Sequence, residues 1–154
     1  MKMFQRILVA TDFSPASTPA LEQSVKMARR DGATLLIAHA YQEPGLVELS
    51  HAPARVYEKW DHELREAVEK KLQPLVERAR KEGVEARALL LTGFADEAII
   101  EAAEQQGADL IVMGTHGRRG AARLFLGSVA SRVISTAPCP VMTVRSAERE
   151  GRRS

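Results

Sequence analysis

The sequence reads ADLIVMGTHG from residue 108 to residue 117, and after nine more residues it continues with Gly127 and Ser128. The part from Leu110 to Met113 is apolar throughout, which is typical of a parallel strand buried on both faces. Beyond it, apolar residues recur at helical spacing, namely Leu126, Val129, Ala130, Val133, Ile134 and Ala137. The chain therefore places a glycine-rich loop between a buried strand and the start of a helix.

This order of strand, glycine loop and helix start suits the binding of a phosphate group. Glycines let backbone N–H groups approach a ligand closely, and a helix N-terminus adds partial positive charge and hydrogen-bond donors. Ser128 offers a hydroxyl as well as an N–H, while Arg118 and Arg119 would either pair with a phosphate or remain solvated. The pattern predicts a nucleotide-binding module. The alternative is that the glycines serve only the turns of the fold.

The rest of the chain alternates between strands and helices in the same way. Further strands are predicted at Arg6–Thr11, Thr34–Tyr41, Glu85–Thr92 and Pro140–Arg145, and further helices from Ser14 or Ser17 to Asp31, from about Val56 to Glu82, and from Ala95 to Gln106. Within the long second helix, Pro74 is expected to kink it or divide it in two. An apolar stripe on that helix is expected to pack in the core or in an interface: Trp60, Leu64, Ala67, Val68, Leu72, Leu75 and Ala79. Such alternation indicates an α/β domain with a mainly parallel sheet and right-handed crossovers.

Length and composition narrow the class of protein. A chain of 154 residues with 45% hydrophobic content fits one domain, and a net charge of +2 is too small to favour nucleic acid or a membrane surface. The sequence has no apolar run of about 20 residues and no signal-peptide pattern. Its single cysteine, Cys139, excludes an internal disulfide, so we expect a buried structural thiol and a cytoplasmic protein.

A candidate binding crevice follows from this predicted order. Parallel sheets bind ligands at the carboxyl ends of their strands, where the winding direction reverses. Asp12 ends the first predicted strand and Gly114 ends the fourth, so both face one crevice if these strands are neighbours. Asp12 would accept hydrogen bonds from ribose hydroxyls or help to hold a metal; its alternative role is to cap the turn. His39, near the end of the second predicted strand, is expected to be a packed sheet histidine.

These motifs resemble those of the universal stress protein family, and in particular of its ATP-binding branch. That branch is marked by Gly-x2-Gly-x9-Gly-Ser/Thr, which Gly114, Gly117, Gly127 and Ser128 match without a gap. The similarity includes the segments ILVATDFS (7–14), GSVASRV (127–133) and APCPV (137–141). It covers nearly everything from Ile7 to Arg145, apart from a segment at 43–55 that matches nothing specific.

The resemblance implies an architecture and an assembly. The fold is a single doubly wound α/β domain over residues 1–146, with a five-stranded parallel sheet in the order 3-2-1-4-5 and helices on both faces. Residues 147–154 form a polar tail. The resemblance also implies a homodimer in which the fifth strand, Val141 to Val144, pairs with its copy across a two-fold axis. An apolar edge strand left open would favour aggregation, which supports this pairing.

The resemblance further implies roles for individual residues. Gly114 and Gly117 would cradle the ribose and the first phosphates, and Gly127 and Ser128 the terminal phosphates. Ala40 corresponds to the position where the family contacts adenine through backbone groups. The remaining candidate contacts adjoin these positions: Thr11, Met113, His116, Arg118, Arg119 and Val129.

The available chemistry argues against dedicated catalysis. The chain lacks the Gly-x4-Gly-Lys-Ser/Thr loop of P-loop enzymes, and no carboxylate is placed by sequence to activate a water at the terminal phosphate. Ser14 or Ser128 would need a base to act as a nucleophile, and the sequence identifies none. The four histidines have no metal-ligand spacing, so Mg²⁺ would bind mainly through the phosphates.

We therefore expect an ATP-binding stress-response regulator that holds its nucleotide and hydrolyses it slowly or incidentally. Its dimer would present a nucleotide-dependent surface to an unknown partner protein, with no membrane or nucleic acid involved. Two alternatives remain at this point. One is a slow ATPase, and the other is a nucleotide-independent dimeric interaction module.

Overall fold

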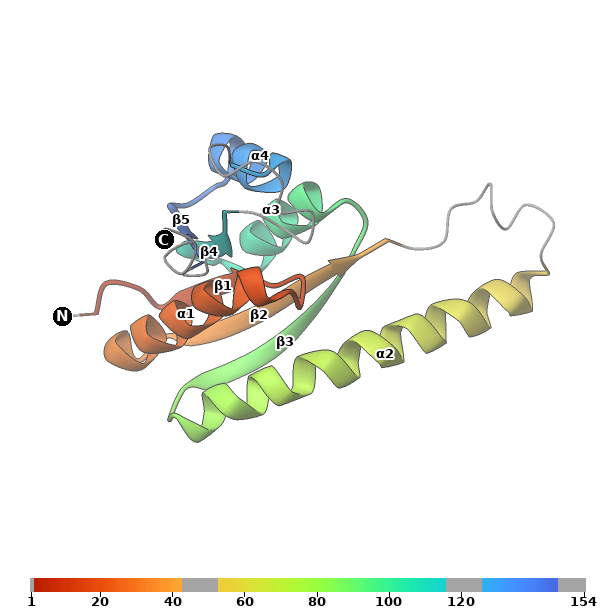
Figure 1. Cartoon of the computed structure of the whole chain (residues 1–154), viewed down its shortest axis with the longest axis horizontal. Coiled ribbons are helices and arrows are strands. Elements are labelled where there is room, and N and C mark those ends of the chain that lie inside the picture. The colour runs from red at the N-terminus through yellow and green to blue at the C-terminus, as the bar shows by residue number, and fades with distance from the viewer. Residues whose placement is uncertain (1, 43–52, 116–125, 147–154) are drawn as a thin grey trace, which may run out of the picture.

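The computed structural model describes residues 2–42, 53–115 and 126–146 (Figure 1). Its elements in chain order are β1 (Arg6–Ala10), the 3-10 helix η1 (Pro15–Ser17), α1 (Thr18–Asp31), β2 (Thr34–Tyr41), α2 (Ala54–Lys81), β3 (Glu85–Thr92), α3 (Ala95–Gln106), β4 (Leu110–Gly114), α4 (Ser128–Thr136) and β5 (Val141–Val144). The predicted bounds of β2, β3 and α3 are confirmed, whereas those of β1, β4 and β5 differ by one or two residues. The boundary proposed between residues 146 and 147 lies at the limit of the described chain.

The five strands form one parallel sheet in the order β3-β2-β1-β4-β5, which confirms the expected topology. β1 lies in the middle and pairs with β2 on one side and with β4 on the other. Successive elements therefore wind outward in opposite directions from the β1–β4 junction. The carboxyl ends of these two strands are adjacent, as the candidate crevice requires.

Two hydrophobic clusters, one on each face of the sheet, hold the helices in place. Alternate residues of β1 show the division: Ile7 and Val9 pack with α1 and α2, while Leu8 packs with α3 and α4. All three side chains are fully buried. Figure 1 shows the same arrangement, with α1 and α2 on one side of the sheet and α3 and α4 on the other. The expectation of helices on both faces is confirmed.

α2 remains one helix through Pro74, so the expected division in two does not occur. Pro74 is exposed, which places its missing N–H bond on the solvent side of the helix. Buried residues on both sides of it, Leu72 and Val76, pack into the same cluster. A proline inside a helix costs about 3 kcal/mol, and burying two large aliphatic side chains returns about 1.5–3 kcal/mol each. Packing therefore outweighs the break.

The apolar stripe on α2 is only partly confirmed. The side chains that α2 buries are Val68, Leu72, Val76 and Ala79. Ala67 is exposed and Trp60 is 52% exposed, so these two residues do not pack in the core of this chain, and the interface alternative is the one that stays a prediction for them. Ala67 is exposed although the next residue, Val68, is buried, so the two residues lie on different sides of the helix. Figure 1 shows that the N-terminal part of α2 extends past the end of β3.

Two carboxylates fix the chain where it enters β1. Asp31, whose side chain is fully buried at the end of α1, accepts a hydrogen bond from the Phe4 N–H at 3.0 Å and pairs with Arg30 at 2.7 Å. Asp109, before β4, accepts from the N–H groups of Gln5 at 2.8 Å and Arg6 at 3.1 Å. The hydrogen bond from Arg30, together with that from Phe4, holds the pKa of the Asp31 carboxyl below its ordinary value of 3.8, although burial acts in the opposite direction.

Asp31→Asn is expected to lower the Tm by about 3–8 °C at neutral pH, because the neutral amide pairs poorly with Arg30 and Phe4. Since the folded-state pKa lies below the ordinary 3.8, the carboxylate stabilises the fold above that pH. This contribution is lost as the pH falls through the folded-state pKa, so the two proteins should converge in acid. Thermal unfolding of both proteins, from neutral pH to below pH 3.8, measures the difference in Tm. Glu22→Gln, which removes an exposed pair with Arg78 at 3.9 Å, is the control and should change little. A difference that does not vary with pH would contradict the assignment.

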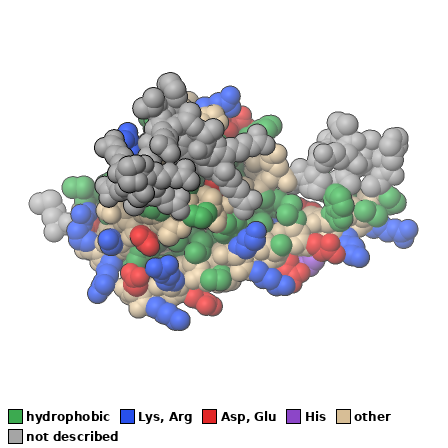
Figure 2. All heavy atoms as spheres, viewed as in Figure 1, with side chains coloured by type: hydrophobic (Ala, Val, Ile, Leu, Met, Phe, Trp, Pro, Cys, Tyr) green, Lys and Arg blue, Asp and Glu red, His purple; other side chains and the backbone are tan. Residues whose placement is uncertain are grey.

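The surface of the described chain is mixed in charge. Figure 2 shows Lys and Arg side chains interspersed with Asp and Glu among the described residues of the face in view. Within the described segments, no helix combines the length and the apolar character needed to cross a bilayer. Cys139 is half-buried against the α3–α4 cluster, and burial raises the pKa of its thiol above the ordinary value. A raised pKa leaves the thiol protonated and unreactive, as a structural role requires.

Candidate functional site

The described parts of the glycine motif lie together at the carboxyl end of β4. Thr115, the residue after Gly114, accepts a hydrogen bond from the Gly127 N–H at 2.8 Å and donates its own N–H to Val144 at 3.3 Å. η1, in the loop after β1, contacts β4. The β1 loop and the start of α4 thus flank the same edge of the sheet. Four candidates lie outside the described residues: His116, Gly117, Arg118 and Arg119.

Gly127 precedes the first turn of α4 with φ −59° and ψ 157°. It has no side chain to cap the helix, and its carbonyl accepts the Ser131 N–H at 3.0 Å. Ser128 is exposed at this end and Val129 is half-buried against the α3–α4 cluster. A helix start of this kind favours an anion electrostatically and presents backbone donors to it.

Thr11 fixes the loop after β1 by hydrogen bonds from every polar group. Its N–H donates to Ala38 on β2 at 2.9 Å, and its carbonyl accepts from His39 Nδ1 at 2.8 Å. Its Oγ1 accepts the Phe13 N–H at 3.0 Å and lies 3.0 Å from the Ser17 hydroxyl. The buried threonine therefore ties the β1 loop to β2 and to η1. His39 is a half-buried sheet residue, as expected.

Asp12 is half-buried and bonded within its own turn. Its Oδ1 accepts the Ser14 N–H at 2.9 Å and also the Ser14 hydroxyl. The sequence identified no base for Ser14, and the structure places this carboxylate against its hydroxyl. The turn-forming role of Asp12 is therefore present. Asp12 follows β1 and Gly114 ends the neighbouring strand β4, so the two residues lie at the same edge of the sheet.

Phe13 is the residue in this loop that the sequence did not single out. Its φ is +64°, a left-handed conformation that bulky residues rarely adopt. Its ring centroid lies 4.4 Å from that of His39, and Lys71 Nζ of α2 lies 5.5 Å from the ring. Hydrophobic periodicity carries no signal for such a contact, because it joins a turn, a strand and a distant helix.

The remaining candidates offer their backbone rather than their side chains. Ala40 is half-buried near the end of β2, opposite Leu91 of β3. Met113 is buried in the α3–α4 cluster, so its side chain is committed to the core. Among the described residues, no group of three or more His, Cys, Asp or Glu side chains could hold a metal.

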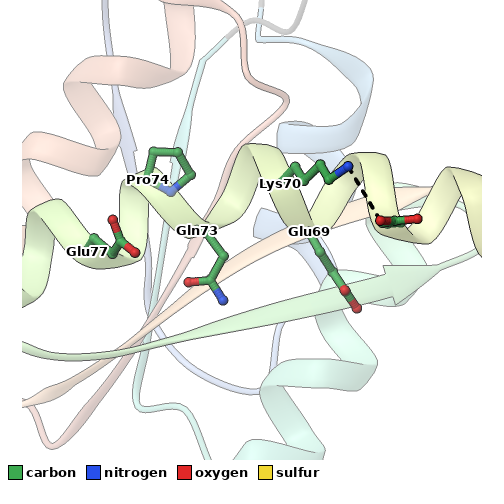
Figure 3. Close-up of a pocket in the computed structure, with 6 residues that line it drawn as sticks. Glu69, Lys70, Gln73, Pro74 and Glu77 are labelled. Atoms are coloured by element: carbon green, nitrogen blue, oxygen red, sulfur yellow. Dashed lines mark ion pairs between the residues drawn. The ribbon is translucent and has the colours of Figure 1, made fainter.

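A hollow on the surface of α2 lies apart from this edge. Its lining residues all belong to the helix: Glu66, Glu69, Lys70, Gln73, Pro74 and Glu77. Figure 3 shows Glu69 and Gln73 directed to one side of α2 and Lys70 to the other, where it pairs with Glu66 at 3.4 Å. Side chains of one exposed helix face that diverge in this way do not form a binding pocket.

Comparisons with known proteins agree with this architecture. The model of the universal stress protein family matches residues 3–145. A universal stress protein from Thermus aquaticus is 40% identical over 152 residues, which cover 93% of this chain and 100% of that protein.

Two solved structures are similar over nearly their whole length. One is the universal stress protein from Archaeoglobus fulgidus in complex with dAMP, with a TM-score of 0.65 and 26% identity, covering 93% of this chain and 99% of that chain. The other is a universal stress protein in complex with cAMP, with a TM-score of 0.66 and 26% identity, covering 94% and 98%. The family match and the 40% identity together show that this chain belongs to the universal stress protein family.

Proposed function

We propose that this chain is an ATP-binding regulator that holds the nucleotide at the edge of the sheet between β1 and β4. The observation that carries the proposal is the juxtaposition of the Asp12 loop and the uncapped start of α4 at one edge. The dAMP and cAMP complexes of two similar structures support an adenine nucleotide as the ligand.

In this proposal each end of the nucleotide has its own partners. Asp12 accepts hydrogen bonds from the ribose hydroxyls, and the backbone at Ala40 contacts adenine. Gly114 and Gly117 cradle the ribose and first phosphates, while Gly127 and Ser128 hold the terminal phosphates. Thr11, Met113 and Val129 frame the site, and His116, Arg118 and Arg119 complete the loop. Mg²⁺ binds mainly through the phosphates, which supply the oxygen ligands that it prefers.

The output of the regulator is a surface of a cytoplasmic homodimer. β5 is an edge strand of the described sheet, and its four residues are all half-buried. Pairing of β5 with its copy would cover that edge and join two nucleotide sites in one assembly. ATP changes the presented surface only to the extent that it binds one shape more tightly than the other.

Calorimetric titration with ATP and Mg²⁺, on protein stripped of bound nucleotide, tests the proposal. Micromolar binding with negligible turnover supports a regulator. Appreciable release of phosphate favours the slow ATPase. Absence of binding favours the nucleotide-independent module and would contradict all of the proposed nucleotide contacts at once.

Asp12→Ala is expected to weaken ATP binding by about 1–3 kcal/mol, because the ribose hydroxyls lose a charged hydrogen-bond acceptor. The matched control is Ser14→Ala, which deletes the hydroxyl that bonds to Asp12 but keeps the carboxylate. Calorimetry on both variants separates the two roles. An unchanged ATP affinity in Asp12→Ala would leave Asp12 with its turn-forming role alone.

A further inference from the structure

We propose that Phe13 is a positioning residue that sets how strongly the site distinguishes ribose from sugars lacking hydroxyls. It acts through the side chains of Phe13, His39 and Lys71, which we call the Phe13 stack. This inference rests on the proposed function, since it concerns the orientation of Asp12 toward the nucleotide.

The backbone at Phe13 is held in an unfavourable conformation. Among the described residues other than glycine, only Phe13 has a positive φ, at +64°. Steric contacts disfavour this region for a bulky side chain, so it persists only where surrounding interactions hold it. Glycine would adopt the same conformation at no cost.

The surrounding interactions come from β2, from α2 and from the loop itself. The Phe13 ring lies 4.4 Å from the His39 ring on β2, with an interplanar angle of 38°. Lys71 Nζ on α2 lies 5.5 Å from the Phe13 ring centroid, within the range of a cation–π interaction. The Phe13 N–H is held by Thr11 Oγ1 at 3.0 Å.

The conformation of Phe13 determines the direction of the neighbouring carboxylate. Asp12 lies between Thr11, whose polar groups are all bonded, and Phe13. Its Oδ1 accepts the Ser14 N–H at 2.9 Å, across the Phe13 backbone. A change of Phe13 to a negative φ would rotate that N–H away from Oδ1 and release the carboxylate. The stack therefore keeps Asp12 in one orientation.

An oriented carboxylate gives the site selectivity for the sugar. A group placed to accept hydroxyl hydrogen bonds loses them when the ligand lacks the hydroxyls, and it is then left poorly solvated. ATP should consequently bind more tightly than 2′,3′-dideoxy-ATP. This preference should weaken when Asp12 is no longer held, because a mobile carboxylate loses entropy on binding ribose.

The test is the ratio of the dissociation constants for 2′,3′-dideoxy-ATP and ATP, measured by calorimetry. Phe13→Gly keeps the positive φ available, but it removes the whole side chain and with it the contacts that hold the backbone there. We expect it to weaken ATP binding by about three- to tenfold, leave 2′,3′-dideoxy-ATP nearly unchanged, and lower the ratio accordingly. Phe13→Tyr, which retains the ring, should keep the wild-type ratio.

A second pair of variants tests the stack without altering the loop. Lys71→Met removes the cation but keeps most of the aliphatic side chain, and it should lower the ratio by about two- to fivefold. Lys70→Met is the matched control, because Lys70 is exposed on the same helix and pairs with Glu66 instead. Its ratio should equal that of the wild type.

The outcomes separate this inference from the function on which it rests. Wild-type protein that fails to bind ATP overturns both. Wild-type protein that binds both nucleotides equally overturns the positioning role and the ribose role of Asp12, while ATP binding itself stands. Variants that keep the wild-type ratio overturn the positioning role alone. An equal loss of affinity for both nucleotides in Phe13→Gly also overturns it, since a purely structural role would give that result.

Discussion

Gly127→Val is expected to lower the affinity for ATP by about 100-fold or more while leaving a folded protein. A side chain forced into a close contact costs about 1–3 kcal/mol, and loss of a hydrogen bond to a charged group costs about 1.5–3 kcal/mol more. Both penalties apply at Gly127 if terminal phosphates lie against the start of α4. Their sum exceeds the effect expected at Asp12, where a single acceptor is lost.

The local backbone explains why this substitution should not unfold the chain. Gly127 has φ −59° and ψ 157°, an extended conformation that valine adopts without strain. Its N–H to Thr115, at 2.8 Å, is retained by any residue except proline. A loss of ATP affinity would therefore mean that the valine side chain occupies the space of the phosphates, and not that the protein has unfolded.

Calorimetry with ATP and Mg²⁺ measures the effect, with circular dichroism as the check on folding. Ser135→Val is the matched control, because Ser135 is exposed near the other end of α4 and its hydroxyl donates to the Ser131 carbonyl of the preceding turn. It should bind ATP as the wild type does. Retention of ATP binding by Gly127→Val would defeat the assignment of Gly127 to the phosphates.

Thr143→Pro is expected to convert the proposed dimer into a monomer. Pro140, just before β5, and Val144, at its end, direct their carbonyls toward the β4 side, where they accept the N–H groups of Ile111 at 3.0 Å and Thr115 at 3.3 Å. Because hydrogen-bonding direction alternates along a strand, Thr143 directs its N–H to the outer edge. Proline removes that donor and places its ring in the path of a partner strand.

Thr143→Pro tests the dimer interface more specifically than a charged side chain in the same strand does. Charge at Val141 or Met142 is also expected to break the dimer, but each side chain packs against a core cluster of its own chain. A charged variant would therefore lose monomer stability as well. Thr143→Val keeps the outward N–H and is the control for Thr143→Pro. Sedimentation equilibrium gives the molar masses, and an unaltered mass in Thr143→Pro would place the interface elsewhere.

The sequence predicts the layered fold because its elements depend on local patterns. β2, β3 and α3 have uninterrupted periodicity between clear stop signals, and their bounds match the structure. The effect of Pro74 depends instead on which side of α2 meets the core, which is a tertiary property. The exposure of Trp60 depends on how far α2 extends beyond the sheet. Neither the orientation of α2 nor its extension beyond the sheet can be predicted from the local sequence.

The candidate site divides in a similar way. Asp12 and Gly114 could be placed at one edge because parallel strands align their carboxyl ends. The hydrogen bonds of Thr11 and the ring contact of Phe13 with His39 could not be predicted, because they depend on the register of β1 against β2. A positive φ at phenylalanine could not be predicted from the sequence either, since turn patterns assign that conformation to glycine or asparagine.

The hydrogen bonds that Asp31 and Asp109 accept from the backbone at the start of β1 have a practical use. They fix the entry of the chain at the amino ends of the strands, and the candidate site lies at their carboxyl ends. An affinity tag or a biosensor tether attached at the N-terminus would thus hold the protein at the edge of the sheet opposite the proposed nucleotide site. A tether following β5, which is the edge strand on this side of the sheet, would emerge beside Thr115. The choice of attachment point therefore decides whether an immobilised sample presents its binding edge to the solution.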